Sequence, residues 1–231
     1  MLGNLAFTLS LYSGQMCTTS QAIIVPANGI DTDEGHKSYD EVCADLAKSV
    51  EKFLSKPEVA CAVLGAIQSS ATADRIDLAN SGKLGKVVLA STKLSNPEFT
   101  GADVRTPVLL ACDAADESAY MEERFGPISF IVKAADTAAA IALSERIVNT
   151  HGALTVGLYS THQEVIDAMT HATWRGKVAL SINLTGGVFV NQSSAFSDYH
   201  GTGGNPSANA SYADSAFVAN RFRVVQRRYH V

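Results

Sequence analysis

Short apolar runs alternate with amphipathic stretches along most of the chain, and this alternation constrains the fold more than any other sequence feature. Each run is short, lacks a polar face and is bounded by turn-forming residues, which is the pattern of a strand buried on both sides. We expect such strands at residues 21–26, 86–90, 107–111, 129–133, 154–159, 177–182 and 188–191. Strands of this kind belong to parallel sheets covered by helices. The sequence therefore predicts an α/β fold with a mostly parallel sheet flanked by helices.

The stretches between these runs predict the helices. The clearest helix spans residues 37–54, where apolar side chains that include Cys43 fall on one face and charged side chains on the other. We expect further helices at residues 71–80, 136–149 and 161–171. The last of these opens with a capping-box pattern at 161–164. Residues 3–12 are compatible with a helix or a strand, and residues 28–36 are expected to form a polar loop.

Composition and missing motifs exclude several classes of protein. An apolar fraction of 46% is too high for a disordered chain, and a net charge of -5 gives no basic surface for nucleic acid. No apolar stretch approaches the ~20 residues that span a bilayer, and the N-terminus lacks a signal peptide's basic region. The cysteines form no CxxC pair, the histidines are scattered, and neither GxGxxG nor GxxxxGK(S/T) occurs. We therefore expect a cytoplasmic protein with reduced thiols, no metal, and neither membrane nor nucleic acid as a partner.

One of the four cysteines stands in a setting that suits a nucleophile. Cys17 follows Gly14 in a segment, residues 13–20, that is rich in small hydroxyl residues. At such a turn, backbone N–H groups can favour the thiolate over the thiol and can bind a developing oxyanion. The alternative is a structural thiol, which is the commoner role of cysteine. Cys43 and Cys61 lie in apolar runs, so we expect both in the core.

Paired glutamates precede a tight turn farther along the chain. Residues 121–128 read MEERFGPI, with Glu122 and Glu123 placed before Phe-Gly-Pro, and they lead into the strand expected at 129–133. Taken alone, this pattern is compatible with a solvated pair of acids before a turn.

Together, the two segments resemble the aldehyde dehydrogenase superfamily, which has a G-Q-x-C segment around its nucleophile and a later E-E-x-F-G-P segment. The order matches, and Cys17 and Glu123 are 106 residues apart. The resemblance continues through GLYS at 157–160, GVFVN at 187–191 and an arginine-rich end at 221–228, so it covers essentially the whole chain. The wording of the two segments and of the tail is most similar to the branch associated with phenylacetic acid degradation.

The resemblance implies a role for each matching residue. Cys17 would attack the aldehyde carbon to give a thiohemiacetal, pass hydride to NAD or NADP, and leave a thioester for water to hydrolyse. Its backbone N–H would form part of the oxyanion hole. Glu123 would bind the ribose hydroxyls of the nicotinamide half of the cofactor, and Phe125 would pack near the nicotinamide ring. Tyr199 and His200 are candidate substrate contacts, although the family's Pro-Phe-Gly-Gly is replaced around them and a mobile loop is the alternative.

The resemblance also implies a domain organisation. Residues 1–215 would form the catalytic domain, with a long loop at 192–215, and residues 216–231 would form a C-terminal strand that pairs subunits into a homo-oligomer. The family places its dinucleotide-binding domain, its general-base glutamate and its oxyanion asparagine before the nucleophile, whereas 16 residues precede Cys17 here. We therefore expect the catalytic domain of a longer enzyme, which without its N-terminal cofactor-binding domain neither binds the cofactor nor turns over an aldehyde.

Two other functions are compatible with the sequence. An acyl-CoA-forming or acyl-phosphate-reducing enzyme of the same fold would share the thioester and differ in the acceptor. A non-catalytic α/β module would use the C-terminal strand for association, and it requires Cys17 to be buried and unreactive.

Overall fold

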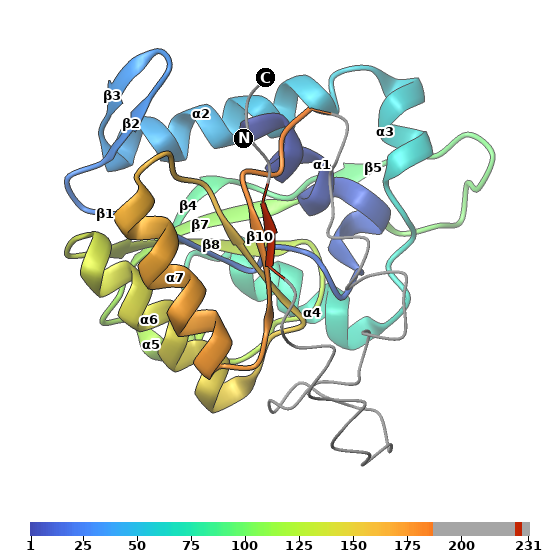
Figure 1. Ribbon diagram of the computed structural model, residues 1–231. Coiled ribbons are helices and arrows are strands. Elements are labelled where there is room, and N and C mark those ends of the chain that lie inside the picture. Colours follow the sequence, from blue (N-terminus) through green and yellow to red (C-terminus); the bar gives the residue numbers. More distant parts are fainter. Residues whose placement is uncertain (187–224, 228–231) are drawn as a thin grey trace. The chain divides into compact units, whose positions relative to one another are not determined.

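The computed structural model describes residues 1–186 and 225–227 of the chain (Figure 1). They divide into two compact units, one formed by Leu2–Asp136 and the other by Thr137 onward together with Met1. Within the described residues, no helix is both long enough and apolar enough to cross a membrane.

The first unit contains a four-stranded sheet in the order β1-β8-β7-β4. Its strands are β1 (Ala22–Pro26), β8 (Ile128–Ala134), β7 (Val108–Asp113) and β4 (Lys86–Leu89). β8 lies in the middle and is parallel to both β1 and β7, whereas β4 closes the edge antiparallel to β7. β8 and β7 are almost entirely buried, as expected for apolar strands covered on both faces. The predicted α/β fold with a mostly parallel sheet is confirmed.

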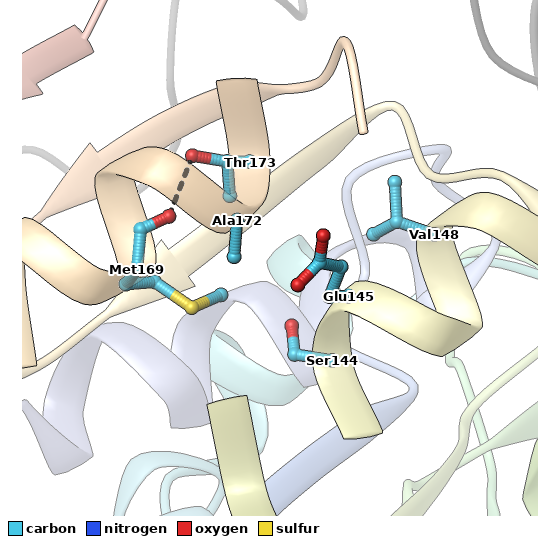
Figure 2. Close-up of a pocket in the computed structure, with 6 residues that line it drawn as sticks. All are labelled: Ser144, Glu145, Val148, Met169, Ala172 and Thr173. Carbon is cyan, nitrogen blue, oxygen red and sulfur yellow. Dashed lines mark hydrogen bonds between the residues drawn. The ribbon is translucent and has the colours of Figure 1, made fainter. Parts of the chain in front are cut away.

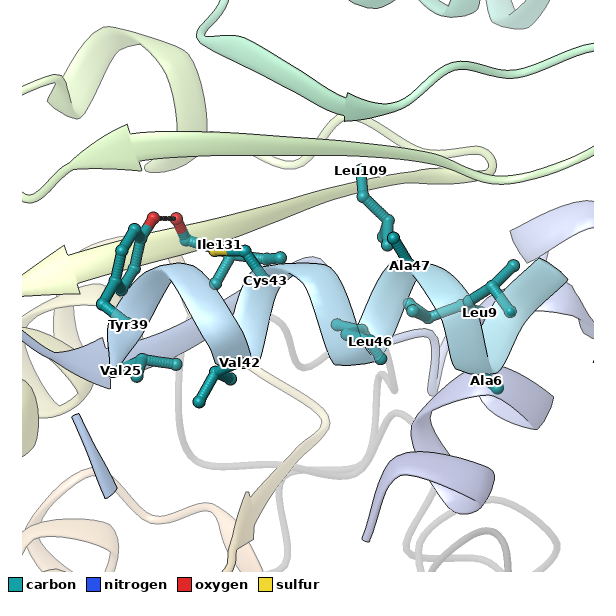
Figure 3. Close-up of a cluster of buried hydrophobic side chains, with 11 residues drawn as sticks. Ala6, Leu9, Val25, Tyr39, Val42, Cys43, Leu46, Ala47, Leu109 and Ile131 are labelled. Atoms are coloured by element: carbon teal, nitrogen blue, oxygen red, sulfur yellow. Dashed lines mark hydrogen bonds between the residues drawn. The ribbon is translucent and has the colours of Figure 1, made fainter. Parts of the chain in front are cut away.

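Helix α2 (Tyr39–Phe53) carries one side of the core of this unit (Figure 3). It begins with a capping box, in which Ser38 and Glu41 each accept a hydrogen bond from the other's backbone N–H. The apolar face of α2 packs against side chains of α1 (Leu2–Ser10), β1, β7 and β8. The Tyr39 hydroxyl donates to the carbonyl oxygen of Ile131 at 2.5 Å, and Cys43 is buried beside it, as predicted.

Several short elements of the first unit differ from the prediction. Residues 28–36 are not a plain loop, because β2 (Ile30–Thr32) and β3 (Gly35–Lys37) form an antiparallel hairpin. The hairpin is held partly by side chains, with His36 Nδ1 2.8 Å from Asp31 Oδ1. Residues 3–12, whose sequence is compatible with a helix or a strand, are mostly helix α1. The remaining elements are η1 (Leu11–Gly14), α3 (Pro57–Val63), α4 (Ser70–Asn80), β5 (Lys93–Leu94), β6 (Val104–Arg105) and α5 (Glu117–Tyr120).

The second unit is a smaller parallel sheet with two helices. Its elements are α6 (Thr137–His151), β9 (Thr155–Leu158), α7 (Gln163–Arg175), β10 (Ala179–Ile182) and β11 (Val225–Arg227). β10 is parallel to both of its neighbours, β9 and β11. The capping box predicted at 161–164 is wrong, because His162 is the N-cap residue and its side chain makes no capping hydrogen bond. The strand expected at 188–191 and the loop expected at 192–215 lie outside the described residues.

Candidate active site

The backbone turns sharply between α1 and Cys17. Tyr12, Ser13 and Gly14 all adopt positive φ values, of 51°, 53° and 62°. The left-handed conformation costs an L-residue about 1–2 kcal/mol, so the first two must be held by other contacts. Ser13 is fully buried, and its hydroxyl lies 2.8 Å from the carbonyl oxygens of both Gly65 and Arg105. This turn sets the direction in which the Cys17 segment leaves the helix.

The side chain of Gln15 fixes the segment from a second direction. Its Nε2 donates to the carbonyl oxygens of Tyr12 and Ala66, at 3.0 and 2.9 Å, and its Oε1 accepts from the backbone N–H of Gln68 at 3.0 Å. Both ends of the amide are therefore used in holding the loop two residues before Cys17.

The two sequence motifs touch each other. A Cβ atom on Gly14 would lie 2.6 Å from the Cα of Pro127 and 2.7 Å from the carbonyl oxygen of Gly126, so only glycine allows this approach. Farther along, the Ser129 hydroxyl donates to the carbonyl oxygen of Ser20 at 2.9 Å. The fold thus brings the Cys17 loop against the turn that follows Glu123.

Cys17 is exposed, but its sulfur is partly desolvated and lies within the field of Glu123. Desolvation raises the pKa of the Cys17 thiol above its ordinary value, and the negative charge of Glu123 raises it further. The backbone N–H groups of Cys17 and Thr18 act in the opposite direction, as the sequence predicted. The two opposing effects outweigh them, so thiol rather than thiolate predominates at neutral pH.

The other cysteines differ from Cys17 in exposure. Cys43 and Cys112 are buried, and desolvation raises the pKa of Cys112 to about 12. Cys61 lies in α3 and is partly exposed, so the prediction that it is a core thiol holds less well than for Cys43. Burial of Cys17, which the association-module alternative requires, is not observed.

Glu123 and Phe125, two residues apart in the sequence, both lie at the surface. Both side chains are exposed, and Phe125 is 39% accessible. Arg75 fixes the backbone at Phe125, because its guanidinium donates to the Phe125 carbonyl oxygen at 3.0 and 3.2 Å. A carboxylate can accept two hydrogen bonds from a ribose diol and a flat apolar ring can pack on a nicotinamide, so these are the residue types that could hold that half of a cofactor.

The model of the aldehyde dehydrogenase family matches residues 1–214 of the chain. The chain belongs to the aldehyde dehydrogenase family. It is 54% identical to an NAD-dependent aldehyde dehydrogenase from Burkholderia multivorans, with a TM-score of 0.86. That match covers 100% of this chain and 41% of the other, so the chain spans about two fifths of the length of that aldehyde dehydrogenase.

More distant structures share the fold. A succinic semialdehyde dehydrogenase from Streptococcus pyogenes, in complex with NADP+, is 24% identical with a TM-score of 0.53, covering 79% of this chain and 37% of that one. Proline utilization A from Bdellovibrio bacteriovorus is 21% identical with a TM-score of 0.55, covering 80% of this chain and 18% of that one. No curated protein sequence matches the chain.

The structure does not test the two substrate-contact residues predicted from the family resemblance. Tyr199 and His200 lie outside the described residues. No sequence motif predicts a role for Gln21, whose side chain hydrogen bonds to the segment of Glu123. Gln21 is the first residue of QAIIVP, a pattern that predicts a strand and gives no information on which groups its side chain contacts.

The second unit has a shallow notch between α6 and α7 (Figure 2). It encloses no space that would admit a water molecule. It is lined by Ser144, Glu145, Val148, Met169, Ala172 and Thr173. Glu145 is engaged by Arg175 in a bidentate ion pair, at 2.5 and 2.8 Å. The notch is too small for a substrate and contains none of the family motif residues. No group of acidic, histidine or cysteine side chains that could hold a metal occurs among residues 1–186.

Proposed function

We propose that this chain carries the catalytic cysteine of an NAD(P)-dependent aldehyde dehydrogenase and that Cys17 is the nucleophile. The observation that supports this most is an exposed Cys17 in a loop whose Gly14 packs against Gly126 and Pro127, directly after the segment of Glu123 and Phe125. The family match and the Burkholderia relative support the reaction class.

In the proposed reaction, the Cys17 thiolate attacks the carbonyl carbon of the aldehyde, and a thiohemiacetal forms as the oxygen takes up the displaced electron pair. Backbone N–H groups at Cys17 and Thr18, which already favour negative charge there, would stabilise that oxygen. When bound, the nicotinamide supplies the hydride acceptor. Loss of hydride from the thiohemiacetal carbon to that acceptor, and of the proton from its oxygen, would leave a thioester on Cys17. Water would then add to the thioester carbon, and the carbon–sulfur bond would break to give the carboxylic acid and the thiol.

Glu123 and Phe125 would hold the nicotinamide half of the cofactor. The exposed Glu123 carboxylate would accept hydrogen bonds from the two ribose hydroxyls, and the Phe125 ring would pack near the nicotinamide. Since the chain spans about two fifths of the Burkholderia aldehyde dehydrogenase, we propose that a cofactor-binding domain outside these residues completes the active enzyme.

The substrate class is proposed from the amino-acid sequence of the two motifs. The segments GQMCTTSQ and MEERFGPISFIVKAAD support an aldehyde of phenylacetic acid degradation as substrate. The cytoplasm as location and a homo-oligomer formed through residues 216–231 belong to the same proposal.

Acylation by an activated ester tests the nucleophile without any cofactor. Attack of the Cys17 thiolate on p-nitrophenyl acetate forms the S–C bond, breaks the ester C–O bond and releases p-nitrophenolate, which is measured by absorbance. We expect release of at least one equivalent per chain at pH 9, where more thiolate is present, loss of that release in Cys17→Ser, and no change in the control Cys61→Ser. Release that persists in Cys17→Ser would contradict the proposal, as would no release from the unaltered chain.

A further inference from the structure

The side chain of Gln21 spans the two segments of the candidate active site. Gln21 follows Cys17 by four residues, at the entry to β1. Its Nε2 lies 3.0 Å from the carbonyl oxygen of Glu122, and its Oε1 accepts a hydrogen bond from the backbone N–H of Arg124. Those two backbone groups belong to the residues on either side of Glu123. The carboxamide of Gln21 therefore straddles the peptide units that carry the Glu123 side chain.

The segment of Glu123 has further hydrogen bonds, one to Gln21 and others within the segment. Gln21 Nε2 also donates to the carbonyl oxygen of Tyr120 at 3.2 Å. The Arg124 guanidinium folds back on α5 and donates to the carbonyl oxygens of Ala119 and Ser118, at 2.6 and 2.7 Å. These arginine contacts tie residues 118–124 to themselves. Gln21 differs because it ties them to the strand that continues directly from the Cys17 loop.

The backbone of Gln21 is itself fixed. Its carbonyl oxygen accepts from the backbone N–H of Phe130 at 2.7 Å, which joins the start of β1 to β8. A side chain that extends from such a fixed point can determine where its partners lie, because both ends of its amide are used.

We propose that Gln21 is a positioning residue, which fixes the backbone on both sides of Glu123 relative to the Cys17 loop. This inference rests on the proposed function of Cys17 and Glu123, and it adds the residue that sets their separation.

The separation has a measurable consequence. Glu123 is the charged side chain whose field raises the pKa of the Cys17 thiol. If Gln21 releases the segment, the carboxylate moves away from the thiol, the thiol pKa falls, and alkylation at a pH below that pKa becomes faster. A purely structural side chain would change stability without this coupling.

The test is a double-mutant cycle on the 231-residue chain, read as the rate of Cys17 alkylation by iodoacetamide between pH 7 and 10. We expect Glu123→Gln to raise the rate at pH 8 about two- to threefold, and Gln21→Met to raise it by a similar factor. In the Glu123→Gln background, Gln21→Met should add nothing. The matched control is Gln163→Met, which removes the hydrogen bond of a glutamine to Asp167 in the second unit and should leave the rate unchanged. Gln21→Ala is measured in parallel with Gln21→Met, so that a packing defect in either variant does not decide the test.

Two outcomes would overturn the inference. One is an unchanged alkylation profile in both folded Gln21 variants while Glu123→Gln still speeds the reaction. The other is a Gln21 effect of equal size with and without Glu123. Failure of the proposed function is separate, since it is read from acylation by p-nitrophenyl acetate and not from the pH profile of alkylation.

Discussion

The carboxylate of Glu123 raises the pKa of the Cys17 thiol across 106 residues of sequence. The coupling exists because Gly14 packs directly against Gly126 and Pro127, which places the two loops in contact. Desolvation is the largest cause of the raised pKa of the Cys17 thiol, and the charge of Glu123 adds to it, so Glu123 further lowers the fraction of Cys17 that is thiolate at a given pH.

We expect iodoacetamide to label Cys17 first in the folded chain. Cys17 is exposed, Cys61 is partly exposed, and Cys43 and Cys112 are buried, so labelling should follow that order despite the raised pKa of Cys17. Peptide mass spectrometry at pH 8 over a time course measures it. In urea all four thiols should react at similar rates, which serves as the control. Equal inertness of all four in the folded chain would contradict the exposure of Cys17.

Replacing Gly14 by alanine should destabilise the chain by about 2–4 kcal/mol. The new Cβ would overlap the backbone of Gly126 and Pro127, and the positive φ of 62° adds strain. Urea unfolding followed by circular dichroism measures the change in free energy of unfolding. The matched control is Gly3→Ala in α1, where nothing lies within 4 Å of the added Cβ, and a small gain is expected there. Similar effects at both sites would argue against the close contact.

Replacing Ser38 by alanine should cost about 1 kcal/mol, since it removes the side-chain half of the capping box of α2. Ser69 is the control, because it is the N-cap residue of α4 but its side chain makes no capping hydrogen bond. Ser69→Ala should therefore change the free energy of unfolding by less than about 0.5 kcal/mol. Urea unfolding of the two variants measures both changes in the free energy of unfolding. Equal losses in Ser38→Ala and Ser69→Ala would contradict a contribution from the capping box.

Arg105 should matter more than its exposed neighbour Lys93. The buried Arg105 guanidinium donates to Asp103 at 2.7 Å and to Asp77 at 3.1 Å, so Arg105→Met should cost about 2 kcal/mol. Lys93 is largely exposed and 3.7 Å from Asp103, so Lys93→Met should cost less than about 1 kcal/mol.

The same arginine predicts a pH dependence of stability. Hydrogen bonding to Arg105 lowers the pKa of Asp103 below its ordinary value of 3.8. An acid with a lowered pKa in the folded state contributes stability above its unfolded pKa, and that contribution is lost as the pH falls through the folded value. Below about pH 4, the free energy of unfolding should thus fall more steeply in the unaltered chain than in Arg105→Met. Parallel curves for the two proteins would contradict this assignment.

Most of the sheet could be predicted from the sequence because burial on both faces leaves a continuous apolar run. β8 and β7 are examples, and α2 follows equally from its apolar stripe. The hairpin of β2 and β3 could not be predicted, since its residues are polar and side-chain contacts such as His36 to Asp31 hold it. Hydropathy patterns carry no information on pairing of that kind.

The motifs of the candidate site could be predicted from the sequence. The contacts that hold those motifs in place could not. Cys17 and Glu123 stand in recognisable segments, whereas the left-handed backbone at Tyr12 and Ser13 depends on carbonyl oxygens that other parts of the fold supply. Gln21 reads as an ordinary residue before a strand, because its partners are backbone groups about 100 residues away.

The order of strands has a consequence for how the protein is made on the ribosome. β8 separates β1 from β7, although it is the last of the three to be synthesised. Until residue 134 has left the exit tunnel, β1 has no neighbour in this sheet and β7 can pair only with β4, so the sheet cannot assemble. Chain termination before β8 would leave Cys17 on a nascent chain in which β1 and one edge of β7 are unpaired and open to aggregation.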